Sequence, residues 1–105
     1  MLLPTIWSWL HQLAMMMTLQ QIIDERISFL KEQINLNNKP EVNSTFQIQI
    51  DAIRSVDDND IEKVETIISH KRNLLKNSKD VHETDRLFAE LDGLEWLQRQ
   101  IARYA

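Results

Sequence analysis

Apolar residues recur along this chain at spacings of three and four positions, which is the pattern of amphipathic α-helices. The clearest stripe consists of Leu19, Ile22, Ile23, Ile27, Leu30 and Ile34. The polar side chains Asp24, Ser28 and Lys31 fall on the opposite side of the same stretch. This pattern predicts a helix from about residue 5 to about residue 36, which ends at the Asn37, Asn38 and Pro40 region.

Two further stripes predict two more long helices in the second half of the chain. They consist of Ile61, Val64, Ile67, Ile68, Leu74 and Leu75, and of Leu87, Leu91, Leu94, Leu97 and Ile101. We expect these helices to span about 58–76 and about 80–104, because Asn77-Ser78 between them is a typical turn sequence.

The segment 45–51 (TFQIQID) fits two interpretations. Phe46, Ile48 and Ile50 alternate as in a strand, whereas Phe46, Ile50 and Ile53 share one face of a helix. Ser44 with Gln47 also resembles a helix capping box. A single strand would lack a pairing partner in this chain, so we predict a short helix over about 44–55.

Composition supports the same fold class, since the chain has one Gly and two Pro among 105 residues. These two residue types normally mark tight turns and phosphate-binding loops. We predict an all-α fold with three to four helices, arranged as a bundle or as long helical hairpins and forming a dimer. Residues 1–17 are expected to form an apolar N-terminal helix or extension, and residues 18–105 a single helical domain.

The first 23 residues contain no Asp, Glu, Lys or Arg, and residues 1–17 are mostly apolar. A signal peptide would need a basic start and a small-residue cleavage site, and a membrane span would need about 20 predominantly apolar residues. Pro4, Ser8 and His11 interrupt this shorter stretch. We therefore favour an amphipathic or buried helix, with a membrane-surface anchor as the alternative. Met17 could also serve as a translation start.

Candidate chemistry is sparse. The chain has no Cys, which removes thiolate catalysis and is in line with a reducing, cytoplasmic location. His11, His70 and His82 lack the spacing of metal ligands, and Gly93 is the only glycine, so no phosphate loop is present. We predict no catalytic, cofactor-binding or metal-binding residues, and a protein that is not an enzyme.

The charges cluster at the ends of the predicted helices. Acidic residues gather where the helix from about residue 58 begins, and its far end carries the basic residues Lys71, Arg72, Lys76 and Lys79. This order complements the helix dipole, which accounts for the clusters without a ligand. The four basic residues are still candidates for phosphate contacts, and the acidic cluster for DNA mimicry, although a net charge of −4 argues against general nucleic-acid binding.

The aromatic residues are the most informative. Trp7 and Trp9 project about 200° apart on a helix, so a single core cannot take both. Trp96 lies opposite the leucine stripe of its helix, where it could stack under Arg99 or Arg103 or pack against another helix. We favour the second arrangement. The predicted protein interface is Trp7, Trp9, Met16, Trp96, Arg99, Arg103 and Asp92.

These observations predict a self-associating, non-catalytic helical module for protein–protein interaction, such as an adaptor, assembly factor, regulator or inhibitor. Its partner would be a second copy or another protein. The alternatives are a nucleic-acid-linked regulator or DNA mimic, and a membrane-surface protein anchored by residues 1–17. Frequent Ile and Asn suggest an AT-rich bacterial or phage genome.

Overall fold

A computed structural model describes the backbone of residues 3–56 and 58–104, and the side chains of residues 19–56 and 61–103. Every regular element in this described part is helical, which confirms the all-α prediction. The helices are α1 (Leu3–Leu36), α2 (Pro40–Arg54), α3 (Val64–Asn77) and α4 (Val81–Tyr104), with a 3₁₀ turn, η1 (Asp58–Lys63), before α3.

At the connection from α1 to α2, the predicted start of the second helix needs correction. Helix α2 begins at Pro40 and not at Ser44, because proline at the first helical position lacks only an N–H that needs no partner there. The Asn43 side chain donates to the Asn37 carbonyl at 3.0 Å and closes the turn. Ser44 therefore lies inside the helix, and the proposed capping box is wrong. Gln47 Nε2 donates forward to Asp51 Oδ1 at 3.0 Å instead.

The ambiguous segment 45–51 is helical. Ile50 and Ile53 are buried, whereas Ile48 is half-buried on another side of α2. The helical spacing thus described this segment better than the alternation did. The predicted start of the next helix at residue 58 needs correction, because residues 58–63 form the 3₁₀ turn and α3 begins only at Val64.

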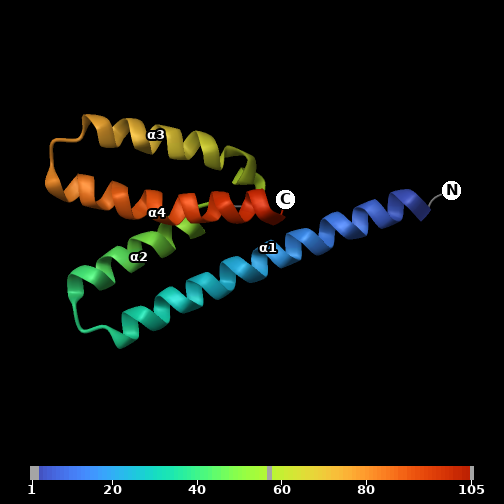
Figure 1. Ribbon diagram of the computed structural model, residues 1–105, viewed down its shortest axis with the longest axis horizontal. Coiled ribbons are helices and arrows are strands. Elements are labelled where there is room, and N and C mark those ends of the chain that lie inside the picture. The colour runs from blue at the N-terminus through green and yellow to red at the C-terminus, as the bar shows by residue number, and fades with distance from the viewer. Residues whose placement is uncertain (1–2, 57, 105) are drawn as a thin grey trace.

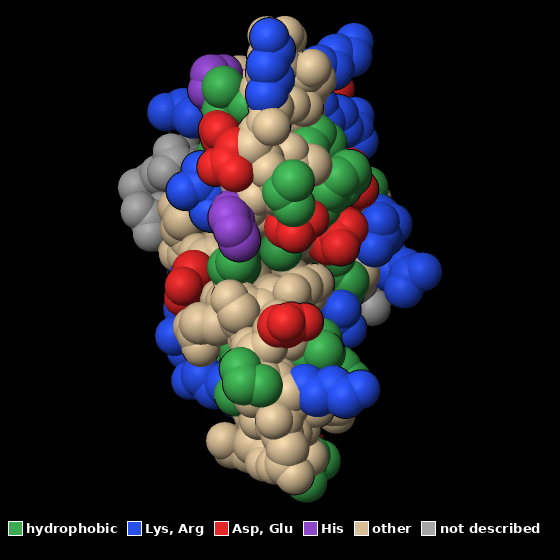
Figure 2. Space-filling model, turned by 90° about the vertical axis from the view of Figure 1, so that its left-hand side faces the viewer, with side chains coloured by type: hydrophobic (Ala, Val, Ile, Leu, Met, Phe, Trp, Pro, Cys, Tyr) green, Lys and Arg blue, Asp and Glu red, His purple; other side chains and the backbone are tan. Residues whose placement is uncertain are grey.

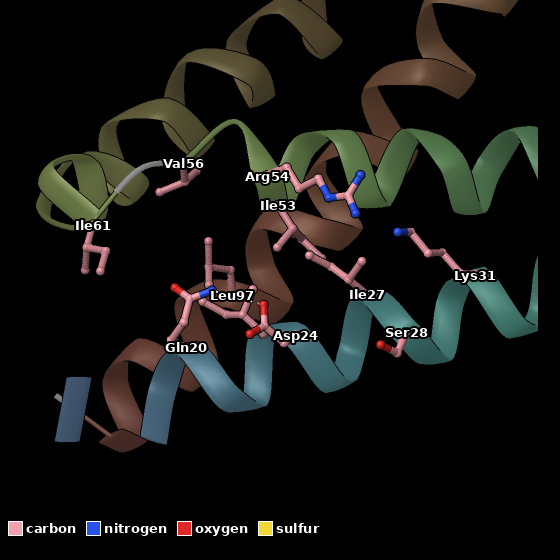
Figure 3. Close-up of a pocket in the computed structure, with 11 residues that line it drawn as sticks. Gln20, Asp24, Ile27, Ser28, Lys31, Ile53, Arg54, Val56, Ile61 and Leu97 are labelled. Atoms are coloured by element: carbon pink, nitrogen blue, oxygen red, sulfur yellow. Dashed lines mark hydrogen bonds between the residues drawn. The ribbon is translucent and has the colours of Figure 1, made fainter. Parts of the chain in front are cut away.

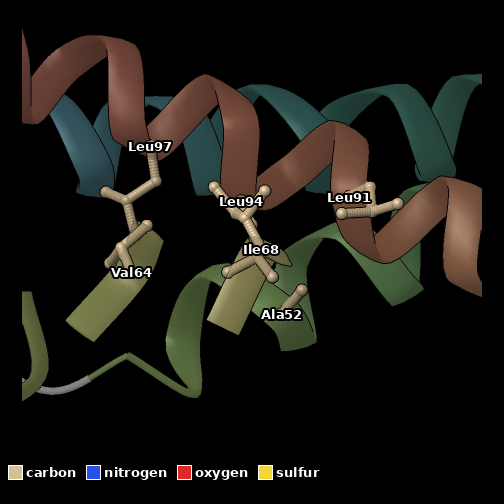
Figure 4. Packing of buried hydrophobic residues seen from close by; sticks show 6 residues of the cluster. All are labelled: Ala52, Val64, Ile68, Leu91, Leu94 and Leu97. Atoms are coloured by element: carbon tan, nitrogen blue, oxygen red, sulfur yellow. The ribbon is translucent and has the colours of Figure 1, made fainter. Parts of the chain in front are cut away.

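Helix α4 is the central element, since α1, α2 and α3 all pack on it. Figure 1 shows α3 beside α4 as one antiparallel hairpin, with α1 and α2 forming a second hairpin across the other side of α4. The larger core cluster joins α2, α3 and α4 and consists of Ala52, Val64, Ile68, Leu91, Leu94 and Leu97 (Figure 4). A second cluster joins α1 and α2 and consists of Ile27, Leu30, Ile50 and Ile53.

A second face of α4, made of small residues, receives α2. Ala89 is 3% exposed and Gly93 is buried. A Cβ at Gly93 would lie only 3.0 Å from the backbone oxygen of Gln49. The two helix backbones approach so closely here that a residue with a side chain would have to push them apart. The only glycine of the chain thus serves the crossing of α2 and α4.

Helix α1 gives the molecule its length. The principal extents are 60 × 34 × 17 Å, and the radius of gyration is 16.7 Å, against about 13 Å for a typical domain of 100 residues. Figure 1 shows the first part of α1 running past the end of α4, with no other helix beside it. The fold is therefore a helical body with one helix that extends beyond it.

Candidate protein-interaction surface

The overhang, defined here as Leu3–Thr18 of α1, carries three of the predicted interface residues. Trp7, Trp9 and Met16 lie on this continuous helix, and their side chains fall outside the described residues. The first residue of α1 with a described side chain, Leu19, is buried at 6% exposure. Leu19 therefore packs in the body of the fold, on the same unbroken helix as the overhang.

Trp96 is half-buried and lies against both core clusters. The guanidinium carbon of Arg26 lies 5.4 Å from the centroid of the Trp96 ring and 5.5 Å from that of Phe29. The cation stacked on Trp96 thus comes from α1 and not from Arg99 or Arg103. Other helices of the same chain do cover this side of α4: α2 crosses it at Gly93, and the second half of α1 lies over Trp96.

The other predicted interface residues on α4, Asp92, Arg99 and Arg103, are exposed. Asp92 lines a shallow groove of about 740 Å³ between α2 and α4, together with the half-buried Ile48 and with Phe88, which is 53% exposed. By helical spacing, these three residues lie on the same side of α4 as Trp96, and they remain exposed while Trp96 packs against α1.

Two members of the basic run are held in ion pairs with α4. Lys71 Nζ lies 2.5 Å from Glu90 Oε2, and Arg72 binds Glu95 at 2.6 Å. Lys76 and Lys79 are exposed. Figure 2 shows basic side chains spread around the visible face with acidic ones among them. The run therefore offers less unpaired positive charge than the sequence suggested.

A groove that the sequence did not reveal lies between α1 and α2 and has a volume of about 570 Å³ (Figure 3). We call it the α1–α2 groove. It is lined by Gln20, Ile23, Asp24, Ile27, Ser28, Lys31, Ile53, Arg54, Val56, Ile61 and Leu97. The sequence pattern placed Asp24, Ser28 and Lys31 on the side opposite the apolar stripe, with no second wall facing them. Only the position of α2 turns that face into one wall of a groove.

Within the described residues, no three His, Asp or Glu side chains come together as metal ligands. His70 and His82 are both exposed, on α3 and α4. None of the helices in this part of the chain is long and apolar enough to cross a membrane. Comparison of the chain with protein families, curated proteins and solved structures gives no match.

Proposed function

We propose that this protein is a non-catalytic helical interaction module that associates with itself through the overhang of α1. The carrying observation is the projection of this helix beyond the rest of the fold (Figure 1). An isolated helix of about 15 residues is marginal in water, and helices in proteins draw most of their stability from packing of an apolar face. A projecting apolar helix of this length therefore needs a partner.

The composition of the overhang indicates the kind of partner. Its sequence holds Trp7, Trp9 and three consecutive Met residues and has no charged side chain. Aromatic residues and Met are enriched at protein interfaces, from whose centres charges are depleted. Binding another protein surface explains this composition better than phosphate recognition does, because a phosphate site needs cationic groups.

Sedimentation velocity on the full chain tests the proposal. The wild type should sediment as a species larger than the 12.5 kDa monomer. The double variant Leu10→Glu, Leu13→Glu should approach the monomer mass, because buried unpaired carboxylates oppose association. Gln21→Glu, an exposed change farther along α1, is the matched control and should leave the mass unaltered. A wild type that stays monomeric at high micromolar concentration would refute self-association.

A further inference from the structure

We infer that the overhang of one copy occupies the α1–α2 groove of a second copy, in a reciprocal antiparallel dimer. This inference rests on the proposed function and adds the receiving surface and the orientation. Ile27, Ile53 and Leu97 line the groove but belong to the buried core, so its accessible apolar side chains are those of the half-buried Ile23, Val56 and Ile61. Figure 3 shows Arg54 and Lys31 extending toward each other across one end of it.

The overhang has the sequence pattern of a helix that packs lengthwise against other helices. Apolar residues recur at three- and four-residue spacing, at Leu3, Ile6, Leu10, Leu13 and Met17. This is the a/d spacing of helices that pack side by side. The pattern stops at Gln20, which is where the α1 wall of the groove begins.

By helical geometry, the stripe positions and the groove positions of α1 fall on nearly the same side of the helix. At 100° per residue, the centre of the stripe differs by only about 50° from the centre of the α1 positions that line the groove. A two-fold axis across α1, close to residue 18, would therefore place each stripe along the other copy's groove. The stripe is about 21 Å long and the α1 wall, from Gln20 to Lys31, about 16 Å, so the two lengths are compatible.

Charge is compatible with a second copy as the occupant. The groove carries Asp24 and Lys31 on its α1 side and Arg54 on its α2 side, and the incoming overhang has no charge to repel any of them. The stripe and one wall of the groove belong to the same helix. One two-fold axis therefore places the overhang of each copy in the groove of the other, and no overhang or groove is left open for a further copy. A foreign helix would fill the groove and leave the overhang uncovered.

The exposed area also matches what such a dimer needs. The chain exposes 7932 Å², whereas a monomer of this mass typically exposes about 6,200 Å². A standard interface removes about 800 Å² from each partner. The exposed area of the monomer above the typical value is therefore large enough for two reciprocal contacts per chain.

Thiol cross-linking of the full chain tests the orientation, since the natural sequence has no cysteine. Chains carrying Leu10→Cys and Ser28→Cys are mixed and treated with a short bismaleimide. We expect a product that joins the two different chains. Leu10→Cys alone should give almost none, because antiparallel pairing separates the two copies of residue 10 by more than about 20 Å. Efficient linkage of Leu10→Cys to itself would mean parallel pairing and would overturn the inference, with self-association intact.

Filling the groove gives an independent measurement. Ser28→Trp places a large side chain at an exposed position that lines the groove, and it should raise the dimer Kd about tenfold or more. Glu25→Trp, exposed and not among the lining residues, is the matched control and should leave the Kd unchanged. An unchanged Kd for Ser28→Trp would overturn the groove as the binding site. A wild type without any dimer would overturn both proposals.

Discussion

The second face of α4 and the overhang of α1 each carry apolar residues beyond the main apolar stripe of the helix, and in both regions these include an aromatic residue. Their surroundings differ. On α4, Trp96 packs against both core clusters and lies beneath Arg26 of the same chain. On α1, no other helix lies beside the overhang (Figure 1). Surplus apolar residues thus indicate a helix with more than one neighbour, but not whether that neighbour belongs to the same chain.

Replacing a tryptophan in each region tests this difference most strongly. Trp96→Ala should lower the free energy of unfolding by about 2–4 kcal/mol, because it leaves a cavity between α4 and α1. Trp7→Ala should change it by less than about 0.5 kcal/mol in dilute monomer, because no other helix lies beside the overhang in Figure 1. Urea unfolding followed by circular dichroism measures both. Equal losses would show that the overhang is packed within the monomer.

The close crossing of α2 and α4 provides a second test of packing on this face of α4, through the backbone. Gly93→Ala should destabilise the protein by about 1–2 kcal/mol, since the new Cβ would meet the Gln49 carbonyl at 3.0 Å. The better helix propensity of Ala, worth about 1 kcal/mol, offsets only part of this cost. Asp92→Ala, at the adjacent exposed position, should be neutral within about 0.5 kcal/mol. A stabilising Gly93→Ala would mean that the helices separate easily.

The ion pairs between α3 and α4 should give the smallest effect. A double-mutant cycle on Lys71 and Glu90, whose side chains are 26% and 19% exposed, should yield a coupling of about 1 kcal/mol. The cycle on Arg72 and Glu95 should yield less, about 0.2–1 kcal/mol, because Arg72 is 58% exposed. High salt should weaken the second coupling more than the first. The reverse order would mean that desolvation cancels the Lys71 pair.

Much of the core could be predicted from the sequence, and part of the candidate surface could not. The leucine stripe of α4 is buried as expected at Leu87, Leu91, Leu94 and Leu97. The half-buried Lys71 of α3 forms an ion pair with Glu90 of α4. That pairing spans 19 positions, and periodicity within one helix does not encode it. The α1–α2 groove escaped notice for the same reason.

The sequence alone determined that this protein is helical, where its long helices lie within a few residues, and which stripe of each is apolar. These are local properties, set by spacing along one helix and by the near absence of Gly and Pro. Only the tertiary structure decided that α4 is central, that α1 covers Trp96, and that no other helix of the described chain lies beside the overhang. Such facts depend on how helices cross, which is fixed by side-chain packing between distant segments.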